Sequence, residues 1–298
     1  MFKCLIVLLF GAFSALGQVC GQYLETLPVQ AAGRVKPLYV HANESVKFIT
    51  GKSKVNGQNA LDIFCQLSLS SLGKGQDIEL PLKVEHIEAK ELLNMEPGAN
   101  SLPASEASQY KELIRSKLMG MKQSTPLKKE LNKVWSRINA YEMIKNGQSW
   151  SVPIFSEGEV LWHGIKDVAA DKDREELRPW LLDQKEEYIE LKGDRFLLEL
   201  TYVKSHVFDI AMLLSLIGIF ATVLRKRIGF GVFFAVSALA IETIGMTMRV
   251  LISGRAPITN MYETVMFSGF GALLIALIVM IFKRDKIFLL AGFGYNVL

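Results

Sequence analysis

The sequence predicts a mostly α-helical protein, in which an exported helical domain precedes a polytopic transmembrane helix bundle with three full spans and the start of a fourth. Mean hydropathy is +0.24 although 21% of the residues are charged. These values agree only if apolar and charged residues occupy different parts of the chain, and the long apolar runs do lie after residue 204. This segregation excludes a single soluble domain and a disordered chain.

The first 21 residues are typical of an export signal. Lys3 precedes an apolar stretch from Cys4 to Phe13, and the small residues Ala15 and Gly17 follow. We expect cleavage after Gly17. An uncleaved anchor is the alternative, although the run is short for a hydrocarbon core of about 30 Å. Either interpretation places the next domain, residues 22–204, outside the cytoplasm.

The clearest helix of that domain begins at Thr125. Thr125 is a good N-cap, and Pro126 suits the first helical position. Apolar residues then recur with helical spacing up to Gly147, which favours the wall of a bundle over a partner-binding coiled coil; they are Leu127, Leu131, Val134, Ile138 and Tyr141. Residues 105–119 are predicted to form the preceding helix of an antiparallel pair.

The remainder of the domain is predicted less regularly. Pro153 keeps residues 150–155 out of a helix. Residues 173–192 form a candidate helix in which Pro179 requires a break or a first-turn position. Residues 196–202 are expected to lead directly into the first span.

Cysteine and histidine usage limits the chemistry. The three cysteines form no CxxC or CxxCH pattern, which excludes a thioredoxin-like oxidoreductase and a c-type cytochrome. At most one disulfide, Cys20–Cys65, is possible; it needs an oxidising compartment, and we favour free thiols. The scattered histidines favour surface or interface roles over metal ligation; they are His41, His86, His163 and His206.

Three runs in residues 205–298 are long enough to span a bilayer, namely 207–224, 228–250 and 264–282. A fourth run, 287–298, starts a further helix that is too short to cross, so we expect the fold to continue beyond Leu298. Six cations at 225–227 and 283–286 fall on one side, against Arg249 and Arg255 on the other. Positive charge marks the cytoplasmic side, so the 251–263 loop and the first domain are predicted to be outside.

The charge balance bears on partners. Residues 1–204 contain equal numbers of basic and acidic residues, so the net charge of +4 belongs to the membrane region. A neutral polar region without a basic stripe argues against nucleic-acid binding.

Two ionisable residues of the second span are candidate functional residues. Glu242 lies about 12 Å from the outer end, assuming a rise of 1.5 Å per residue. Arg249 is two turns further along the same face, too far for a direct pair. Glu242 marks either a polar, proton-accessible cavity or a carboxyl paired to another helix or to loop groups, and both alternatives remain open.

The outer loop contains the run Gly-Arg-Ala-Pro-Ile-Thr-Asn-Met-Tyr-Glu-Thr, residues 254–264. This run resembles the signature of the CcsA/ResC-type cytochrome c assembly proteins, in which Pro-x-Ser/Thr-Asn-x-Tyr-Glu stands in an external loop ahead of a transmembrane helix. Residues 257–263 match that pattern. Residues 27–38, Leu-Pro-Val-Gln-Ala-Ala-Gly-Arg-Val-Lys-Pro-Leu, also resemble an external segment of long, fused members.

The resemblance implies a part in haem delivery and attachment to apocytochrome c at the outer face of the inner (cytoplasmic) membrane. The implied partners are haem, apocytochrome c and a sister assembly subunit. Four loop residues would shape the haem or partner surface: Arg255, Asn260, Tyr262 and Glu263. Arg255 would suit a haem propionate, because a guanidinium matches carboxylate geometry.

The chain also departs from the family. Members have a Trp-rich segment with a Trp-Gly-x-Asp core flanked by haem-ligating histidines, whereas the four tryptophans here are dispersed and no histidine follows His206. Haem iron needs an axial donor such as histidine, so we expect the ligands beyond Leu298 and no enzymatic activity from this chain alone. The alternative function is a non-enzymatic transporter subunit, or a receptor with an external ligand-binding domain.

Overall fold

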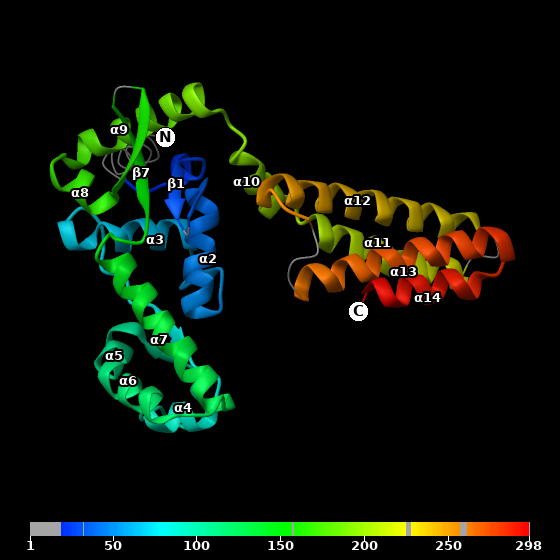
Figure 1. The fold of residues 1–298 in the computed structure, drawn as a ribbon, viewed down its shortest axis with the longest axis horizontal. Helices are drawn as coiled ribbons and strands as arrows, with labels where there is room; N and C mark the ends of the chain where they lie inside the picture. Colours follow the sequence, from blue (N-terminus) through cyan, green and yellow to red (C-terminus); the bar gives the residue numbers. More distant parts are fainter. Residues whose placement is uncertain (1–18, 32, 157, 225–227, 257–260, 298) are drawn as a thin grey trace, which may run out of the picture. The chain divides into compact units, whose positions relative to one another are not determined.

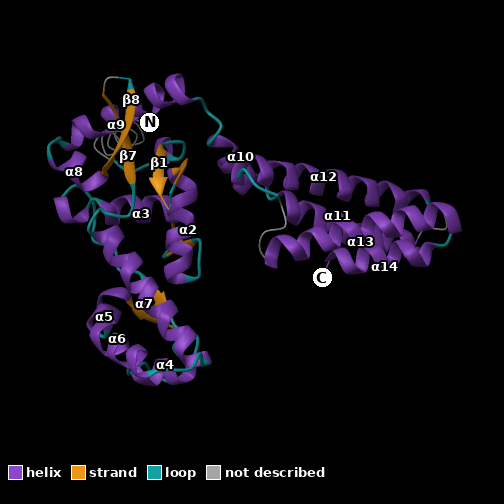
Figure 2. Ribbon diagram, viewed as in Figure 1, coloured by secondary structure: helices purple, strands orange, loops and turns teal. Residues whose placement is uncertain are grey.

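The computed structural model describes residues 19–31, 33–156, 158–224, 228–256 and 261–297. The predicted signal peptide lies outside these residues. The chain divides between Leu197 and Leu198 into two compact units, which we call unit 1 and unit 2. Unit 1 mixes helices with short strands, and unit 2 consists of helices in its described part (Figures 1 and 2).

Unit 1 alternates short strands and helices before its longer helices α7 and α9. Its helices are α2 (Leu38–Thr50), α3 (Ala60–Ser68), α4 (Ile87–Leu92), α5 (Ala104–Gln109), α6 (Lys111–Gly120), α7 (Pro126–Lys145), α8 (Ile165–Ala170) and α9 (Arg174–Lys192), with 3-10 turns at Gln22–Leu24 and Ser70–Leu72. Its strands are β1 (Pro28–Ala31), β2 (Arg34–Pro37), β3 (Lys54–Val55), β4 (Gln58–Asn59), β5 (Pro81–Lys83), β6 (Ser101–Pro103), β7 (Ser151–Ser156) and β8 (Glu159–Gly164).

The main sheet has the order β2-β1-β7-β8, and all its neighbouring strands are antiparallel. Two hairpins build it. The β1–β2 hairpin turns at Gly33, whose φ of 79° is a conformation that glycine adopts at no steric cost. The two hairpins are far apart in the sequence, and they join where Gln30 of β1 pairs with Ser151 of β7.

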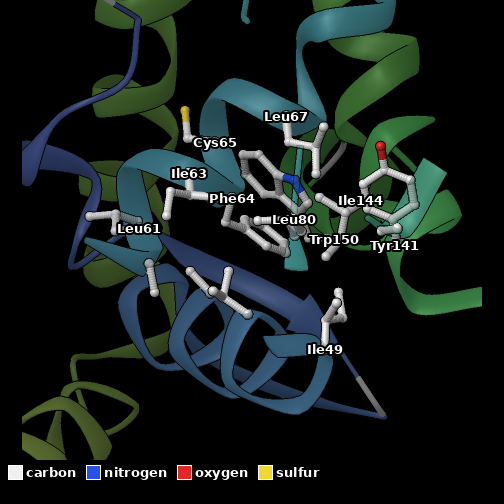
Figure 3. Close-up of a cluster of buried hydrophobic side chains, with 14 of the residues drawn as sticks. Ile49, Leu61, Ile63, Phe64, Cys65, Leu67, Leu80, Tyr141, Ile144 and Trp150 are labelled. Atoms are coloured by element: carbon white, nitrogen blue, oxygen red, sulfur yellow. The ribbon is translucent and has the colours of Figure 1, made fainter. Parts of the chain in front are cut away.

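The core of unit 1 is centred on Trp150 and Phe64, both fully buried between α2, α3 and α7 (Figure 3). The Trp150 indole N–H donates to Ser68 Oγ at 3.1 Å, which satisfies its one polar group. The His41 ring packs edge-on against Phe64 with ring centroids 5.1 Å apart. Aromatic burial thus joins the helices to the start of β7.

Helix α7 follows the sequence prediction closely. Thr125 Oγ1 accepts the Lys128 N–H at 3.1 Å, as expected of an N-cap. Four members of the predicted apolar stripe are buried, Leu131, Val134, Ile138 and Tyr141. The helix is therefore a wall of the core, as predicted, and strands contribute to this core together with the helices.

Other predicted elements need correction. Residues 105–119 form two helices, α5 and α6, which break at Tyr110. Pro179 lies inside α9 at its sixth residue rather than in the first turn. Pro179 cannot donate a hydrogen bond to Glu175, but Leu177 and Leu181 on the same helix are buried in the core and hold α9 in place. The 150–155 segment is non-helical as predicted, and forms β7.

The expectation of free thiols is wrong for Cys20 and Cys65. The two sulfurs are bonded, across a sequence separation of 45 residues. Cys20 and Val19 are both buried in the core of unit 1. The disulfide therefore fastens the beginning of the described chain to α3.

Unit 2 contains α10 (Leu197–Ser205), α11 (Val207–Leu224), α12 (Gly229–Ser253), α13 (Met261–Lys283) and α14 (Lys286–Val297). Three helical segments are long and apolar enough to cross a membrane: 197–224, 229–253 and 263–283. His206, whose φ is 49°, separates α10 from α11 by a kink. Residues 196–202 lead into the first span, as predicted, through this kink. The chain is a multi-pass membrane protein by this criterion.

Helices α11 to α14 pack side by side (Figure 1). Glycines allow their close approach, as is common where transmembrane helices meet. A Cβ built on Gly292 would lie 2.4 Å from the Ala276 Cβ, and one built on Gly218 would lie 2.3 Å from the Phe293 ring. These contacts place α14 against α13 and α11.

Candidate functional site

The loop signature ends in a cluster that ties three helices together, here called the helix-end cluster: Tyr202, Arg249 and Glu263. Arg249 is in the last turns of α12, Glu263 is in the first turn of α13, and Tyr202 is on α10. Arg249 Nη2 donates to Glu263 Oε1 at 2.5 Å, and Nη1 donates to the Tyr202 hydroxyl at 3.0 Å. The guanidinium also lies 5.8 Å from the centroid of the Tyr202 ring.

Burial makes this ion pair more than a surface contact. The Glu263 side chain is 6% exposed and that of Arg249 is 24% exposed. A buried carboxylate is stable only when it is paired and hydrogen-bonded. Arg249 supplies both the opposite charge and the hydrogen bond. The two residues therefore fix the distance between the end of α12 and the start of α13.

The four signature residues have different positions. Arg255 is exposed just after α12, where its backbone N–H meets Ser253 Oγ at 3.4 Å. Glu263 is buried against Arg249. Asn260 lies outside the described residues, as does the side chain of Tyr262. Arg255 is thus the described signature residue whose side chain faces solvent.

A second cluster lies midway along α11 and α12 and near the end of α14, here called the mid-helix cluster: Ser215, Glu242 and Asn296. Asn296 Nδ2, from α14, donates to Glu242 Oε1 on α12 at 2.8 Å and to Ser215 Oγ on α11 at 3.0 Å. Glu242 is 6% exposed. The carboxyl predicted in the second span is therefore paired to other helices, and it does not meet Arg249.

Ser215, Asn296 and Tyr202 were not among the residues predicted from the sequence. Asn296 is the amide in an otherwise apolar terminal run, which was a usable signal because amides in transmembrane helices bond across helix interfaces. Ser215 and Tyr202 gave no such signal. A serine in a span often bonds its own helix, and a tyrosine near a span is commonly an interface anchor.

Haem iron is held by an axial donor such as histidine. No group of three or more His, Cys, Asp or Glu that could hold a metal ion occurs among the described residues. His206 is the last histidine of the sequence, and its Nδ1 lies 2.9 Å from Asp209 Oδ2. Unit 2 thus offers the exposed guanidinium of Arg255, which suits a carboxylate.

Unit 1 contributes one histidine with a shifted pKa. Burial lowers the pKa of His41, and the neighbouring Lys36 cation lowers it further. The ring Nε2 lies 3.0 Å from the Ser149 carbonyl oxygen, so that nitrogen carries the donated hydrogen. His41 is held neutral in the core and serves packing.

No protein-family model and no curated protein matches this chain in sequence comparison.

Proposed function

We propose that the chain takes part in cytochrome c biogenesis, delivering haem for attachment to apocytochrome c on the outer face of the inner membrane. The observation that carries the proposal is the Pro-Ile-Thr-Asn-Met-Tyr-Glu run at residues 257–263, which leads into α13. Its final residue, Glu263, is bonded to Arg249 at the end of α12. A loop whose two ends are fixed in this way suits a surface that must hold its shape for a partner.

Two further features support an outer location for unit 1. Disulfides persist in oxidising compartments, and Cys20 and Cys65 are bonded. The cation-rich connections at 225–227 and 283–286 favour the cytoplasmic side for the opposite ends of the spans. We therefore place unit 1 in the periplasm, preceded by an export signal.

The chain's own residues would act at the edge of the porphyrin. Arg255 would bind a propionate through its guanidinium fork, and the Arg249–Glu263 pair would hold the loop that presents Arg255. Haem, when bound, supplies the vinyl groups to which the apocytochrome thiols become attached. The iron ligands are assigned to a segment or sister subunit outside this chain.

Arg255→Ala tests this role. We expect the variant, purified together with the segment or sister subunit that holds the iron ligands, to retain less than about half of the haem that co-purifies with the corresponding wild-type protein, since a charge-assisted hydrogen bond contributes about 1.5–3 kcal/mol. Covalent c-type haem in the cells should fall with it. Lys283→Ala, which removes an exposed cation at the other end of α13, is the control. Unchanged haem content and cytochrome yield in Arg255→Ala would dismiss the assignment.

A transporter subunit or an external ligand receptor is the second candidate function. The mid-helix cluster favours it, because polar groups at the middle of a bilayer commonly mark transport pathways. Deletion of the gene distinguishes the two functions. If the chain is a transporter subunit or a receptor, covalent attachment of haem to c-type cytochromes stays intact; if it acts in cytochrome c biogenesis, that attachment is lost.

A further inference from the structure

The mid-helix cluster has an unusual hydrogen-bond balance. It contains one amide donor group, the Asn296 Nδ2, and this group serves both the Ser215 hydroxyl oxygen and Glu242 Oε1. The second carboxyl oxygen, Glu242 Oε2, is buried and has no hydrogen-bond partner among the described residues. The side chain as a whole is 94% buried, given its exposed fraction of 6%.

The cluster lies at the middle of the spans. Ser215 and Glu242 are near the centres of α11 and α12. Asn296 follows the start of α14 by ten residues, about 15 Å at 1.5 Å per residue, which is half of a hydrocarbon core of about 30 Å. Helix α13 passes close by, since a Cβ on Gly269 would lie 2.9 Å from Asn296 Oδ1. Helices α11, α12, α13 and α14 therefore meet at this point.

No described cation faces Glu242 from these helices. The charged residues of α11 and α13 lie at helix ends, namely Asp209, Glu263 and Lys283, and α14 has Lys286 at its start. Arg249, on α12 itself, is bonded to Glu263. An ionised carboxylate in such surroundings has one neutral donor and no counter-charge, which is far costlier than a neutral acid in the same place.

We infer that Glu242 is a proton-binding site at the middle of the membrane, with the carboxyl held in its neutral acid form by hydrogen bonding to Asn296. Oε1 is the carbonyl oxygen that accepts the amide, and Oε2 carries the proton. A small metal cation is the competing ligand. The Asn296 NH₂ group occupies the position between Ser215 Oγ and Glu242 Oε1 that such an ion would need, and this geometry favours the proton. The inference is independent of the role in cytochrome assembly.

Infrared spectroscopy of the purified chain in nanodiscs at pH 7.5 tests the inference. Solvent-exposed and ion-paired carboxyls are ionised at this pH, so a carbonyl stretching band of protonated carboxylic acid reports a group such as Glu242. We expect this band in the wild-type protein and its loss in Glu242→Gln. Glu263→Gln is the matched control, because Glu263 is equally buried but paired with Arg249; it should leave the band unchanged.

Two results would overturn the inference. One is the absence of an acid band from the wild-type protein, which needs no variant and so does not depend on how Glu242→Gln folds. The other is a rise in melting temperature when choline is replaced by sodium or potassium, abolished in Glu242→Gln, since that result would identify a metal cation as the ligand.

Discussion

At the scale of single residues, Arg249 is the residue on which the loop signature depends. It bonds Glu263 and Tyr202 at once. Glu263 is 6% exposed, so its carboxylate is unavailable to a ligand while the pair is formed. In the proposed function, Glu263 is therefore a positioning residue, and the exposed Arg255 is the residue proposed to meet the ligand.

Removing one partner of this pair should destabilise unit 2 strongly. Arg249→Ala removes the guanidinium that pairs with the buried Glu263 carboxylate, and breaking a buried ion pair in this way costs on the order of 3 kcal/mol. The measurement is thermal unfolding of the purified protein, followed by helical circular dichroism. Arg255→Ala, six residues along and exposed, should unfold like the wild type. If Arg249→Ala and Arg255→Ala unfold alike, the pair has no structural role.

His41 predicts a pH dependence for unit 1. Burial and then Lys36 lower its pKa in the folded state below 6.5, so below pH 6.5 the unfolded chain takes up a proton that the folded chain does not. The stabilisation is complete above that pH and is lost as pH falls, with a slope of at most about 1.4 kcal/mol per pH unit for one proton.

Tryptophan fluorescence measures this effect in the intact chain, because all four tryptophans are in unit 1. Denaturant unfolding between pH 7.5 and pH 5 should show a smaller pH dependence in His41→Asn than in the wild type. His163→Asn alters an exposed histidine and is the control. An identical pH dependence in His41→Asn and the wild type would contradict the assignment.

Single residues were predictable from sequence where one side chain has one obvious requirement. Thr125 had to cap a helix and does so. For Glu242 the sequence left a proton-accessible cavity and a paired carboxyl both open; the carboxyl accepts from Asn296 on another helix, and the same amide also donates to Ser215. The choice of partner depends on which helices pack together, and spacing along one helix contains no information about that.

At the scale of elements, α14 depends on a glycine. Gly292 faces Ala276 on α13, and a Cβ on it would approach the Ala276 Cβ to 2.4 Å. Gly292→Ala should therefore push α13 and α14 apart and destabilise unit 2 by about 1–3 kcal/mol, the usual effect of overpacking. Gly294→Ala is a matched control on the same helix, since a Cβ there meets nothing within 4 Å.

Limited proteolysis and thermal unfolding compare the two glycine variants. Gly292→Ala should be cut sooner and melt lower than the wild type, while Gly294→Ala should match or exceed the wild type because alanine favours helix. Equal behaviour of the two variants would mean that α13 and α14 are not in close contact at Gly292.

Helices were more predictable than strands. Helix α7 has a cap and a periodic stripe, both local properties of the sequence. The main sheet is less evident from the sequence because the pairing of β7 with β1 joins residues more than 100 positions apart. For Pro179 the prediction of a break or a first-turn position was wrong. Its local effect opposes a helix, but the burial of Leu177 and Leu181 outweighs that effect.

At the scale of the whole molecule, the Cys20–Cys65 disulfide contributes to the stability of unit 1. Closing a loop of 45 residues should stabilise unit 1 by about 2–4 kcal/mol. The double variant Cys20→Ser/Cys65→Ser should unfold at lower denaturant concentration by tryptophan fluorescence, and reductant should shift the wild type toward it. Reductant that leaves the wild type unchanged would contradict the bond.

The organisation of the chain followed from composition alone. Apolar runs and cation-rich connections predicted three spans near residues 207–224, 228–250 and 264–282, and the structure has membrane-length helices at these places. The Cys20–Cys65 bond was considered from the sequence but not favoured, because sequence separation does not show that residue 20 returns to α3. The function rests on the signature at 257–263 and remains a proposal.

The most direct test of that proposal is covalent haem in c-type cytochromes after deletion of the gene that encodes this chain. Haem-stained gels of membranes from the deletion strain should lose c-type cytochromes while b-type haem is unchanged. Expression of the wild-type gene should restore them, and the Arg255→Ala variant should restore them only in part. A deletion strain with normal covalent c-type haem would contradict the account and leave a multi-pass membrane protein of another function.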